Sequence, residues 1–201
     1  MPKIRFKRHD KSWSEIALGD ITERITRKNI NLESTLPLTI SAQLGIIDQK
    51  EFFDKQVASR DISNYFLIKN GEFAYNKSYS NGYPWGAIKR LDKYKMGVLS
   101  TLYIVFRPTV IESEFLAQYY ETENWHAEIL KYAAEGARNH GLLNITPVDF
   151  FKTLLIVPQS KEEQMVIGDF LLALDKQIAV QTQKLEQIKR LKMAYLQKML
   201  I

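Results

Sequence analysis

Two polar loops of the chain carry side chains whose types suit contact with a polyanion. Residues 76–86 read Asn-Lys-Ser-Tyr-Ser-Asn-Gly-Tyr-Pro-Trp-Gly, and residues 136–141 read Gly-Ala-Arg-Asn-His-Gly. Arginine and asparagine present planar donors that pair with base edges, whereas lysine and serine suit phosphates. Alternating polar residues near position 40 form a third set. The candidate contact residues are Ser41, Gln43, Asn76, Lys77, Ser78, Lys89, Arg90, Arg138, Asn139 and His140.

Each of these sets also has a simpler explanation. Either loop alone can be a solvated connection rich in turn-forming residues, because glycine, asparagine and serine favour turns. The alternating polar residues near position 40 can be the exposed face of an ordinary strand. The residue types therefore mark candidates for binding and leave both explanations open.

The sequence contains no arrangement of residues that predicts catalysis. Its three histidines, His9, His126 and His140, have no neighbours at metal-ligand spacing, and an H-E-x-x-H pattern is absent. A phosphate-binding loop, a G-x-G-x-x-G fingerprint and a G-x-S-x-G nucleophile elbow are absent as well. We therefore predict no catalytic residue, no metal site and no cofactor.

Composition permits a polyanionic partner and a real hydrophobic core. The net charge is +5, the pI is near 9.2, and 45% of the 201 residues are hydrophobic. The absence of cysteine excludes disulfides and cysteine-bound metals, and it fits a reducing compartment. No apolar run reaches the length of a membrane span. We expect a cytoplasmic protein without membrane contact.

The order of the expected strands and helices, which must position these loops, predicts an α+β head with a mixed sheet. Residues 1–12 read as an exposed basic lead-in, before a short strand and a brief helix within residues 13–25. Asn70-Gly71 is a strong hairpin signal. Thr146-Pro147 starts a short helix, since proline is favoured at the first helical position. Candidate strands cover 38–41, 65–68, 72–75, 86–89, 101–107 and 153–157, and candidate helices cover 114–121 and 123–134.

The last forty or so residues predict one long helix. Ser160 and Glu163 form a capping box at its start. Apolar residues then recur at alternating steps of three and four, with Gln181 as a polar break and a less regular register near the end. This spacing is typical of a helix lying along another helix. The predicted pairing residues are Leu171, Leu174, Ile178, Gln181, Leu185, Ile188, Tyr195 and Met199.

This helix divides the chain into a head, residues 1–157, and an arm, residues 158–201. Forty residues with a rise of about 1.5 Å each make a rod of roughly 60 Å, longer than most faces of a compact domain. The alternative is an ordinary amphipathic helix folded back on its own head. The length favours an arm that pairs with a second helix.

Several segments, in their order and spacing, match a known family. They are Leu-Gly-Asp-Ile at 18–21, Phe-Ala-Tyr-Asn-Lys-Ser at 73–78, Gly-Val-Leu-Ser-Thr-Leu-Tyr at 97–103, Glu-Gly-Ala-Arg-Asn-His-Gly-Leu at 135–142, Leu-Asp-Lys-Gln-Ile at 174–178 and Leu-Gln-Lys-Met at 196–199. With them the chain resembles the specificity (S) subunit of type I restriction–modification systems over nearly its whole length. Family members usually carry two recognition domains and two helices, so this chain corresponds to half a subunit.

The resemblance implies a DNA target-recognition head and a spacer helix in a non-catalytic subunit. Methylation and cleavage would belong to modification and restriction subunits, with the methyltransferase docked on the outer face of the arm. Two copies would pair through residues 160–200 and read a bipartite, inverted-repeat site. Under this hypothesis Gln43, Ser78, Arg138 and Asn139 read base edges, while Lys77, Lys89, Arg90 and the basic lead-in contact phosphates.

Two other functional classes remain open on the sequence. One is a dimeric protein-interaction adaptor whose head binds a peptide or a protein. The other is a stand-alone nuclease or methyltransferase, which would be active without partner subunits. DNA binding that weakens steeply with salt would separate the first class from a DNA reader.

Overall fold

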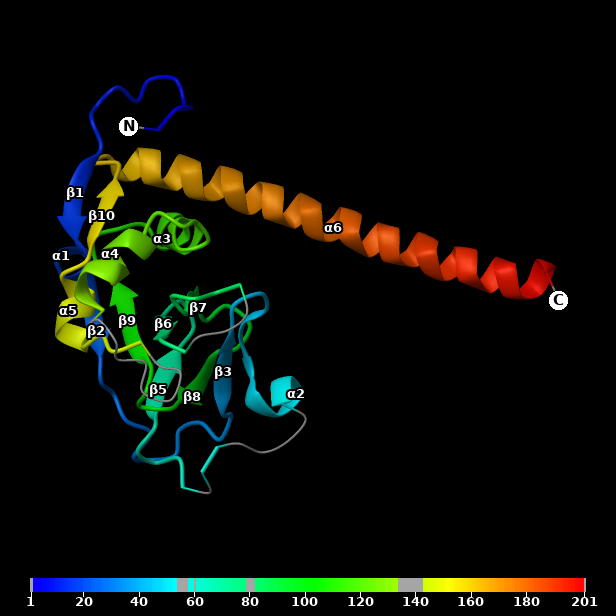
Figure 1. The fold of residues 1–201 in the computed structure, drawn as a ribbon, viewed down its shortest axis with the longest axis horizontal. Helices are drawn as coiled ribbons and strands as arrows, with labels where there is room; N and C mark the ends of the chain where they lie inside the picture. The colour runs from blue at the N-terminus through cyan, green and yellow to red at the C-terminus, as the bar shows by residue number, and fades with distance from the viewer. Residues whose placement is uncertain (1, 54–57, 60, 79–81, 134–142, 201) are drawn as a thin grey trace.

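The computed structural model describes residues 2–53, 58–59, 61–78, 82–133 and 143–200. Figure 1 shows a head of strands and short helices, from which α6 (Lys161–Met199) projects as an extended rod of 39 residues. Every residue from 173 to 200 is exposed. The predicted α+β class and the long C-terminal helix are confirmed. The alternative of a helix folded back along its head is wrong, because only the first turns of α6 pack on the head.

The beginning of the chain and the end of the head meet in a two-stranded antiparallel ladder. β1 (Ser14–Ala17) pairs with β10 (Leu154–Val157), and α1 (Leu18–Ile21) follows β1 directly. The Leu18 amide donates to the Thr153 carbonyl at 2.9 Å, which extends this contact. Because α6 begins only a few residues after β10, the ladder fixes the point at which the arm leaves the head.

The centre of the head is a four-stranded antiparallel sheet in the order β2-β9-β6-β7, with two antiparallel strand pairs, β3-β4 and β5-β8, beside it. The bounds are β2 (Thr22–Ile25), β9 (Ile104–Pro108), β6 (Phe73–Asn76), β7 (Ala87–Arg90), β3 (Leu38–Ser41), β4 (Gly45–Asp48), β5 (Phe66–Lys69) and β8 (Met96–Leu99). Side chains alternate between the two faces of a strand. Both faces of the central sheet are covered, so it is a middle layer.

Two hydrophobic clusters lie on opposite faces of this sheet. Phe73 and Tyr75 of β6 belong to the larger cluster, whereas Ala74, between them, belongs to the smaller one. Short helices cover the larger cluster, and the two strand pairs enclose the smaller one. These helices are α3 (Ser113–Tyr119), α4 (His126–Tyr132) and α5 (Pro147–Phe151), whereas α2 (Gln49–Phe53) lies against β3 and β4. As predicted, α5 begins at Pro147, and the Thr146 hydroxyl accepts the Asp149 amide at 3.1 Å.

Most predicted strands are present close to their expected positions, but β2, β4, β8 and α2 were not predicted. Glycine is unfavourable in strands and weakened the pattern in β4 and β8. In β8 it is required by packing: a Cβ atom on Gly97 would lie 2.3 Å from Leu38 Cδ1. The close approach of β3 to β8 is a tertiary contact that the local sequence does not reveal.

The hairpin predicted at Asn70-Gly71 is wrong in its pairing. A turn does occur there, with Gly71 at φ +82°, but β5 pairs with β8 while β6 pairs with β7 and β9. The Asn70 side chain donates to the carbonyls of Asp92 and Tyr94, both at 3.1 Å. These bonds tie the turn to the β7–β8 connection, so it serves as a corner between two sheets.

The basic lead-in is not simply exposed, which corrects the prediction for residues 1–12. The Arg5 guanidinium donates to both carboxylate oxygens of Glu163 at 2.6 and 2.7 Å, and the Phe6 ring lies edge-on against Phe170. Trp13 Nε1 also donates to Glu163, at 3.3 Å. We call residues 2–13 the N-terminal strap, because they run across the first turns of α6.

Only half of the predicted capping box forms. The Ser160 hydroxyl accepts the Glu163 amide at 3.3 Å, as predicted. The Glu163 carboxylate does not return to the cap, because it is held by Arg5 and Trp13. Glu163 is 1% exposed, and the hydrogen bond from Arg5 lowers its pKa. The residue that marked a helix start in the sequence therefore anchors the strap.

Gly168 marks the closest approach of α6 to the head. A Cβ atom at this position would lie 2.9 Å from the Phe115 amide nitrogen and 3.1 Å from Glu114 Cβ, both in α3. The Gln164 side chain also bridges the two helices, since it accepts the Glu112 amide at 2.9 Å and donates to the Pro158 carbonyl at 2.8 Å. The base of the arm is thus fixed to the head by contacts with α3.

Candidate functional site

The structure brings the ends of the two predicted binding loops together. The Leu143 amide donates to the Lys77 carbonyl at 3.0 Å, and Lys77 Nζ donates to the Ile145 carbonyl at 3.3 Å. Burial lowers the pKa of Lys77. The Asn76 side chain accepts the Ser78 amide at 3.0 Å, which shapes the start of the first loop. Segments nearly seventy residues apart therefore meet at one place on the head.

Part of the predicted set lies outside the described residues. Arg138, Asn139 and His140 belong to this part, and so do residues 79–81 of the first loop. The structure describes the flanking residues, which are 76–78 and 82–86 for the first loop and 143–145 for the second. The roles of Arg138, Asn139 and His140 stay predictions from the sequence.

A second part of the predicted set lines a polar hollow between the head and the base of the arm. The hollow has a volume of about 480 Å³ and is bounded by the β3–β4 turn, β7, α3 and α6. Gln43, Lys89 and Arg90 line it, together with the acidic residues Glu114 and Glu121. Lys89 also lines a smaller hollow beside Gly82 and Tyr83, so the two surfaces adjoin. Three of the predicted residues thus share one concave surface.

The cations in this hollow are engaged by carboxylates of the head. Lys89 Nζ lies 2.6 Å from both carboxylate oxygens of Glu121. Arg90 donates from Nε to Asp92 at 2.7 Å and from one terminal nitrogen to Glu114 at 2.6 Å. Burial lowers the pKa of Arg90, but the hydrogen bonds to Glu114 and Asp92 outweigh that effect and the pKa is raised. Both side chains would have to exchange a carboxylate for a phosphate to bind DNA.

The two predicted residues near the β3–β4 turn differ in their access. Ser41 is buried, and its hydroxyl accepts the Leu44 amide at 3.2 Å. Gln43 is exposed in the turn between the strands. Ser41 therefore shapes the turn, while Gln43 is available to a ligand.

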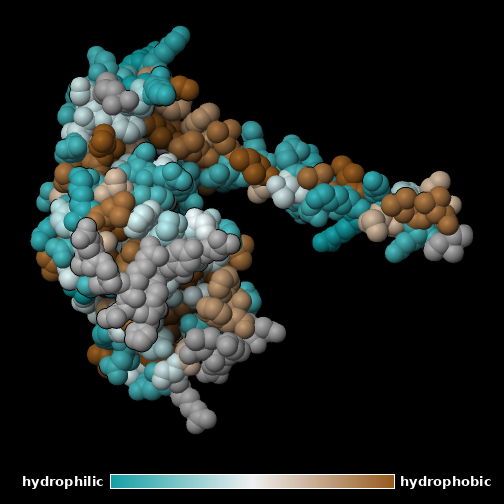
Figure 2. All heavy atoms as spheres, viewed as in Figure 1, coloured by the Kyte–Doolittle hydropathy of each residue, from teal (hydrophilic) through white to brown (hydrophobic). Residues whose placement is uncertain are grey.

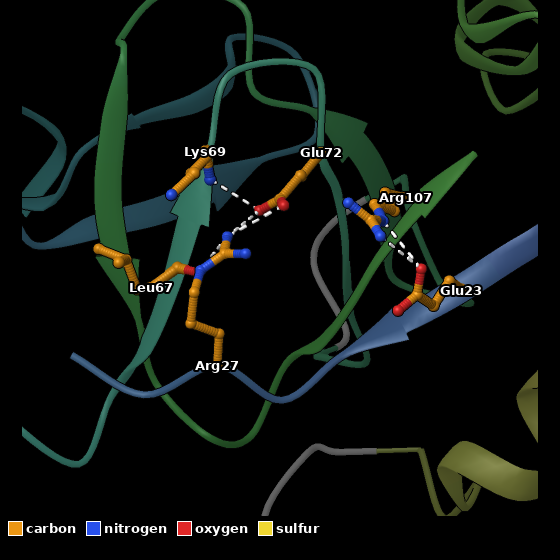
Figure 3. A network of polar contacts seen from close by, with 6 residues as sticks. All are labelled: Glu23, Arg27, Leu67, Lys69, Glu72 and Arg107. Carbon is orange, nitrogen blue, oxygen red and sulfur yellow. Dashed lines mark hydrogen bonds and ion pairs between the residues drawn. The ribbon is translucent and has the colours of Figure 1, made fainter. Parts of the chain in front are cut away.

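Two groups of polar contacts, which sequence reasoning missed, lie at the central sheet (Figure 3). The Arg27 guanidinium donates to both carboxylate oxygens of Glu72, at 2.9 and 2.8 Å, and to the Leu67 carbonyl at 3.0 Å. Glu72 also accepts the Lys69 amide at 2.7 Å. Arg107 of β9 pairs with Glu23 of β2 at 2.7 Å. Because the partners are up to 84 residues apart, no local pattern marks them.

The predicted pairing residues follow one stripe along the free part of α6. The exposed fraction is 39% at Leu174, 63% at Ile178 and Ile188, and 75% at Met199. Figure 2 shows hydrophobic side chains recurring along the arm and gathered again at its tip. Exposed apolar side chains in such a row form a continuous surface of the kind that is often an interaction site. Leu171 alone of the set is half-buried, because it lies under the strap.

An apolar hollow of about 440 Å³ opens where the strap crosses α6. Strap residues Ile4, Phe6 and Trp13 form one side of it, and Ile167, Phe170 and Leu171 of α6 form the other. Ile4 is 91% exposed and Phe170 is 49% exposed, so the apolar surface is open to solvent. This hollow lies at the head end of the stripe.

Comparison with solved structures identifies the fold. The HsdS subunit from Thermoanaerobacter tengcongensis matches with a TM-score of 0.56 and 20% identity, over 93% of this chain and 46% of that one. A chain from a structure on complex assembly and conformational transition of the type I R-M system matches with a TM-score of 0.59 and 18% identity, over 89% of this chain and 46% of that one. The fold is therefore that of type I R-M specificity subunits, and this chain spans less than half the length of either neighbour.

Other comparisons add nothing to this fold assignment. Neither a family model nor a curated protein matches the sequence. Across the described residues, no helix is both long enough and apolar enough to cross a bilayer.

Proposed function

We propose that this chain is a DNA-recognition subunit of a type I restriction–modification complex, which reads one half of a bipartite site and pairs through α6. The fold likeness, over about nine-tenths of the chain, is the observation that carries the proposal. The chain would perform no chemistry itself and would work in the cytoplasm with modification and restriction subunits. Residues 1–157 form the recognition domain, and residues 158–201 form the pairing helix.

The recognition surface is the region where the two polar loops meet. The bonds between Lys77 and residues 143–145 support this placement, because they hold both loop ends side by side. Gln43, Asn76 and Ser78 approach base edges or the adjacent backbone, together with Arg138, Asn139 and His140. Lys77, Lys89 and Arg90 contact phosphates, with Lys89 and Arg90 leaving their carboxylate partners when DNA binds. Ser41 supports the turn that carries Gln43.

Pairing through α6 gives a homodimer with antiparallel arms. Residues 161–175 contain four acidic residues and one basic residue, whereas residues 176–199 contain six basic residues and one acidic residue. Parallel arms would place the two basic tips together, while antiparallel arms place each basic tip beside an acidic base. Opposite charges on two adjacent helices attract each other, and like charges repel. The two heads then lie at opposite ends of the pair and present two identical reading surfaces.

A dimeric adaptor that binds a peptide or protein is the second candidate, and the fold comparison does not favour it. The decisive experiment is selection from a random duplex library with the full chain, followed by binding at 50 to 300 mM salt. We expect an enriched inverted repeat with one spacer length, bound with an affinity that falls steeply as salt rises through counterion release. A folded chain that enriches no sequence and binds no duplex at low salt would overturn the proposal.

A further inference from the structure

The apolar stripe on α6 begins before the free part of the arm, in the turns that pack on the head. At the same spacing of three and four residues it continues towards the head through Leu171 and Ile167, and Phe170 lies beside Leu171 at the apolar hollow. Residues three and four apart lie on one face of a helix. The strap occupies this part of the stripe, with Arg5 on Glu163 and Phe6 on Phe170. A second helix lying on the stripe therefore meets the strap before it reaches the base of α6.

We infer that the N-terminal strap is the end stop that sets the register of the paired arms. The occupant of the apolar hollow is the tip of α6 from a second copy, with Met199 and Leu200 packed against Ile4 and Phe170. This inference rests on the proposed pairing of two copies. It adds the contact that limits how far the two arms overlap. It also assigns a structural role to a segment that the sequence analysis had marked as a basic lead-in in contact with phosphates.

Three observations select the tip of a second copy as the occupant. The hollow is continuous with the stripe that pairing covers, so a helix on one runs into the other. Met199 and Leu200 are 75% and 76% exposed, which leaves the tip with apolar surface to bury. The opposite charges of tip and base favour the antiparallel orientation that brings the tip to this end.

The stop also fixes which residues lie at the two-fold axis. Without the strap, a symmetric overlap of residues 163–199 would be centred at Gln181. With the strap in place, the free stripe runs from Leu174 to Met199 and its centre falls between Leu185 and Ile188. Apolar residues then meet at the axis instead of a pair of glutamines. The distance between the two heads, and hence the spacer between two half-sites, follows from this register.

Because the chain contains no cysteine, single cysteines can test the contact directly. We expect an oxidised mixture of Ile4→Cys and Met199→Cys chains to form a disulfide-linked dimer. Within one chain these positions are separated by most of α6, about 40 Å, so the bond must join two copies. Met199→Cys alone is the matched control, since it cross-links to itself only if the arms are parallel. A dimer in which the mixture does not cross-link would overturn the inference.

Spin labels at Gln197→Cys measure the register itself. The expected separation of the two labels along the arm is about 32 Å with the strap as the stop, against about 48 Å for an overlap centred at Gln181. Replacing Arg5 and Phe6 by alanine should lengthen the distance, whereas Lys7→Ala, also in the strap and exposed, should leave it unchanged. If the chain is a dimer with the longer label separation, the strap is not the stop, although the arms still pair. The same conclusion follows if the separation does not change when Arg5 and Phe6 are replaced. A monomer in the ultracentrifuge contradicts pairing itself, and the stop with it.

Discussion

At the scale of single residues, the same side chain can have a role that the sequence pattern does not indicate. Glu163 reads as the acidic partner of a capping box, yet in the folded chain its carboxylate holds Arg5 and Trp13. Lys89 and Arg90 read as free phosphate ligands, yet each lies against a carboxylate. A residue type states what a side chain is able to do, and its neighbours decide what it does.

Replacing Glu163 by glutamine should lower stability and weaken its pH dependence. The pKa of Glu163 is lower in the folded chain than in the unfolded one, because Arg5 donates to its carboxylate. Its stabilising effect is therefore complete above the ordinary carboxyl pKa of 4.5 and is lost as the pH falls through the lowered pKa. Urea unfolding between pH 3 and pH 7 measures this effect. Glu33→Gln, at an exposed position of the head, is the control, and equal losses in both variants would contradict the assigned role.

Replacing Arg138 by alanine should reduce both affinity and discrimination. A base-reading arginine contributes about 1–3 kcal/mol at one base-pair position, which is a loss of roughly 5- to 150-fold for the preferred sequence. Competition binding with duplexes altered at single positions measures it. Arg24→Ala removes the same charge from an exposed position of β2 and should weaken all sequences alike, if it has any effect. Unchanged affinity and preference in the Arg138 variant would show that this residue does not read DNA.

At the scale of elements, the arm is positioned by one close crossing. At Gly168, α6 lies so close to α3 that the backbone of Phe115 occupies the space that a side chain would need. A glycine inside a helix usually costs about 1 kcal/mol relative to alanine. Here the close approach explains why the cost is tolerated, since it fixes the angle at which the arm leaves the head.

The substitution Gly168→Ala should therefore destabilise the protein in spite of its higher helix propensity. The added Cβ atom would lie 2.9 Å from a backbone nitrogen, so α6 must shift. Overpacking of this kind costs about 1–3 kcal/mol, which exceeds the propensity gain. Thermal unfolding measures the change, with Thr182→Ala on the exposed arm as a control that should be neutral or slightly stabilising. A more stable Gly168→Ala variant would show that the crossing is loose.

At the scale of the whole molecule, the arm projects from the head and exposes a row of apolar side chains that the head does not cover. A row of half- to three-quarters-exposed apolar side chains is unfavourable in water, and burial of such a side chain yields about 1.5–3 kcal/mol. In the proposed dimer, this row would supply the free energy of pairing, and the length of the arm would set the distance between the two heads. Two linked reading surfaces bind one duplex far more tightly than either does alone.

Replacing Ile188 by aspartate should convert the dimer to a monomer and reduce affinity for a two-half-site duplex by about 10²- to 10⁴-fold. The reason is that a buried carboxylate in the middle of the stripe has no partner. Sedimentation and binding to duplexes with one or two half-sites measure both effects. Gln183→Asp introduces the same charge on the opposite side of the helix and should remain dimeric. Dimers formed equally by both variants would place the pairing surface elsewhere.

Local patterns in the sequence determined most of the elements and the fold class. The spacing of three and four after residue 160 defined the arm, the Thr146-Pro147 step defined the start of α5, and runs of β-branched and aromatic residues located most strands. Each of these signals depends on neighbours within a few residues, so a single sequence contains them in full. The resemblance of ordered motifs to specificity subunits gave the fold that the structural comparison shows.

Only the tertiary structure decided which distant residues meet. It paired β5 with β8 and not with β6, joined Lys77 to the 143–145 segment, placed the strap on α6, and matched Lys89 and Arg90 with carboxylates. The partners in these contacts are about 25 to 160 residues apart, and any one of several similar side chains could have supplied them. Packing of the whole chain selects among those alternatives, because each contact depends on how the sheet and helices are already arranged.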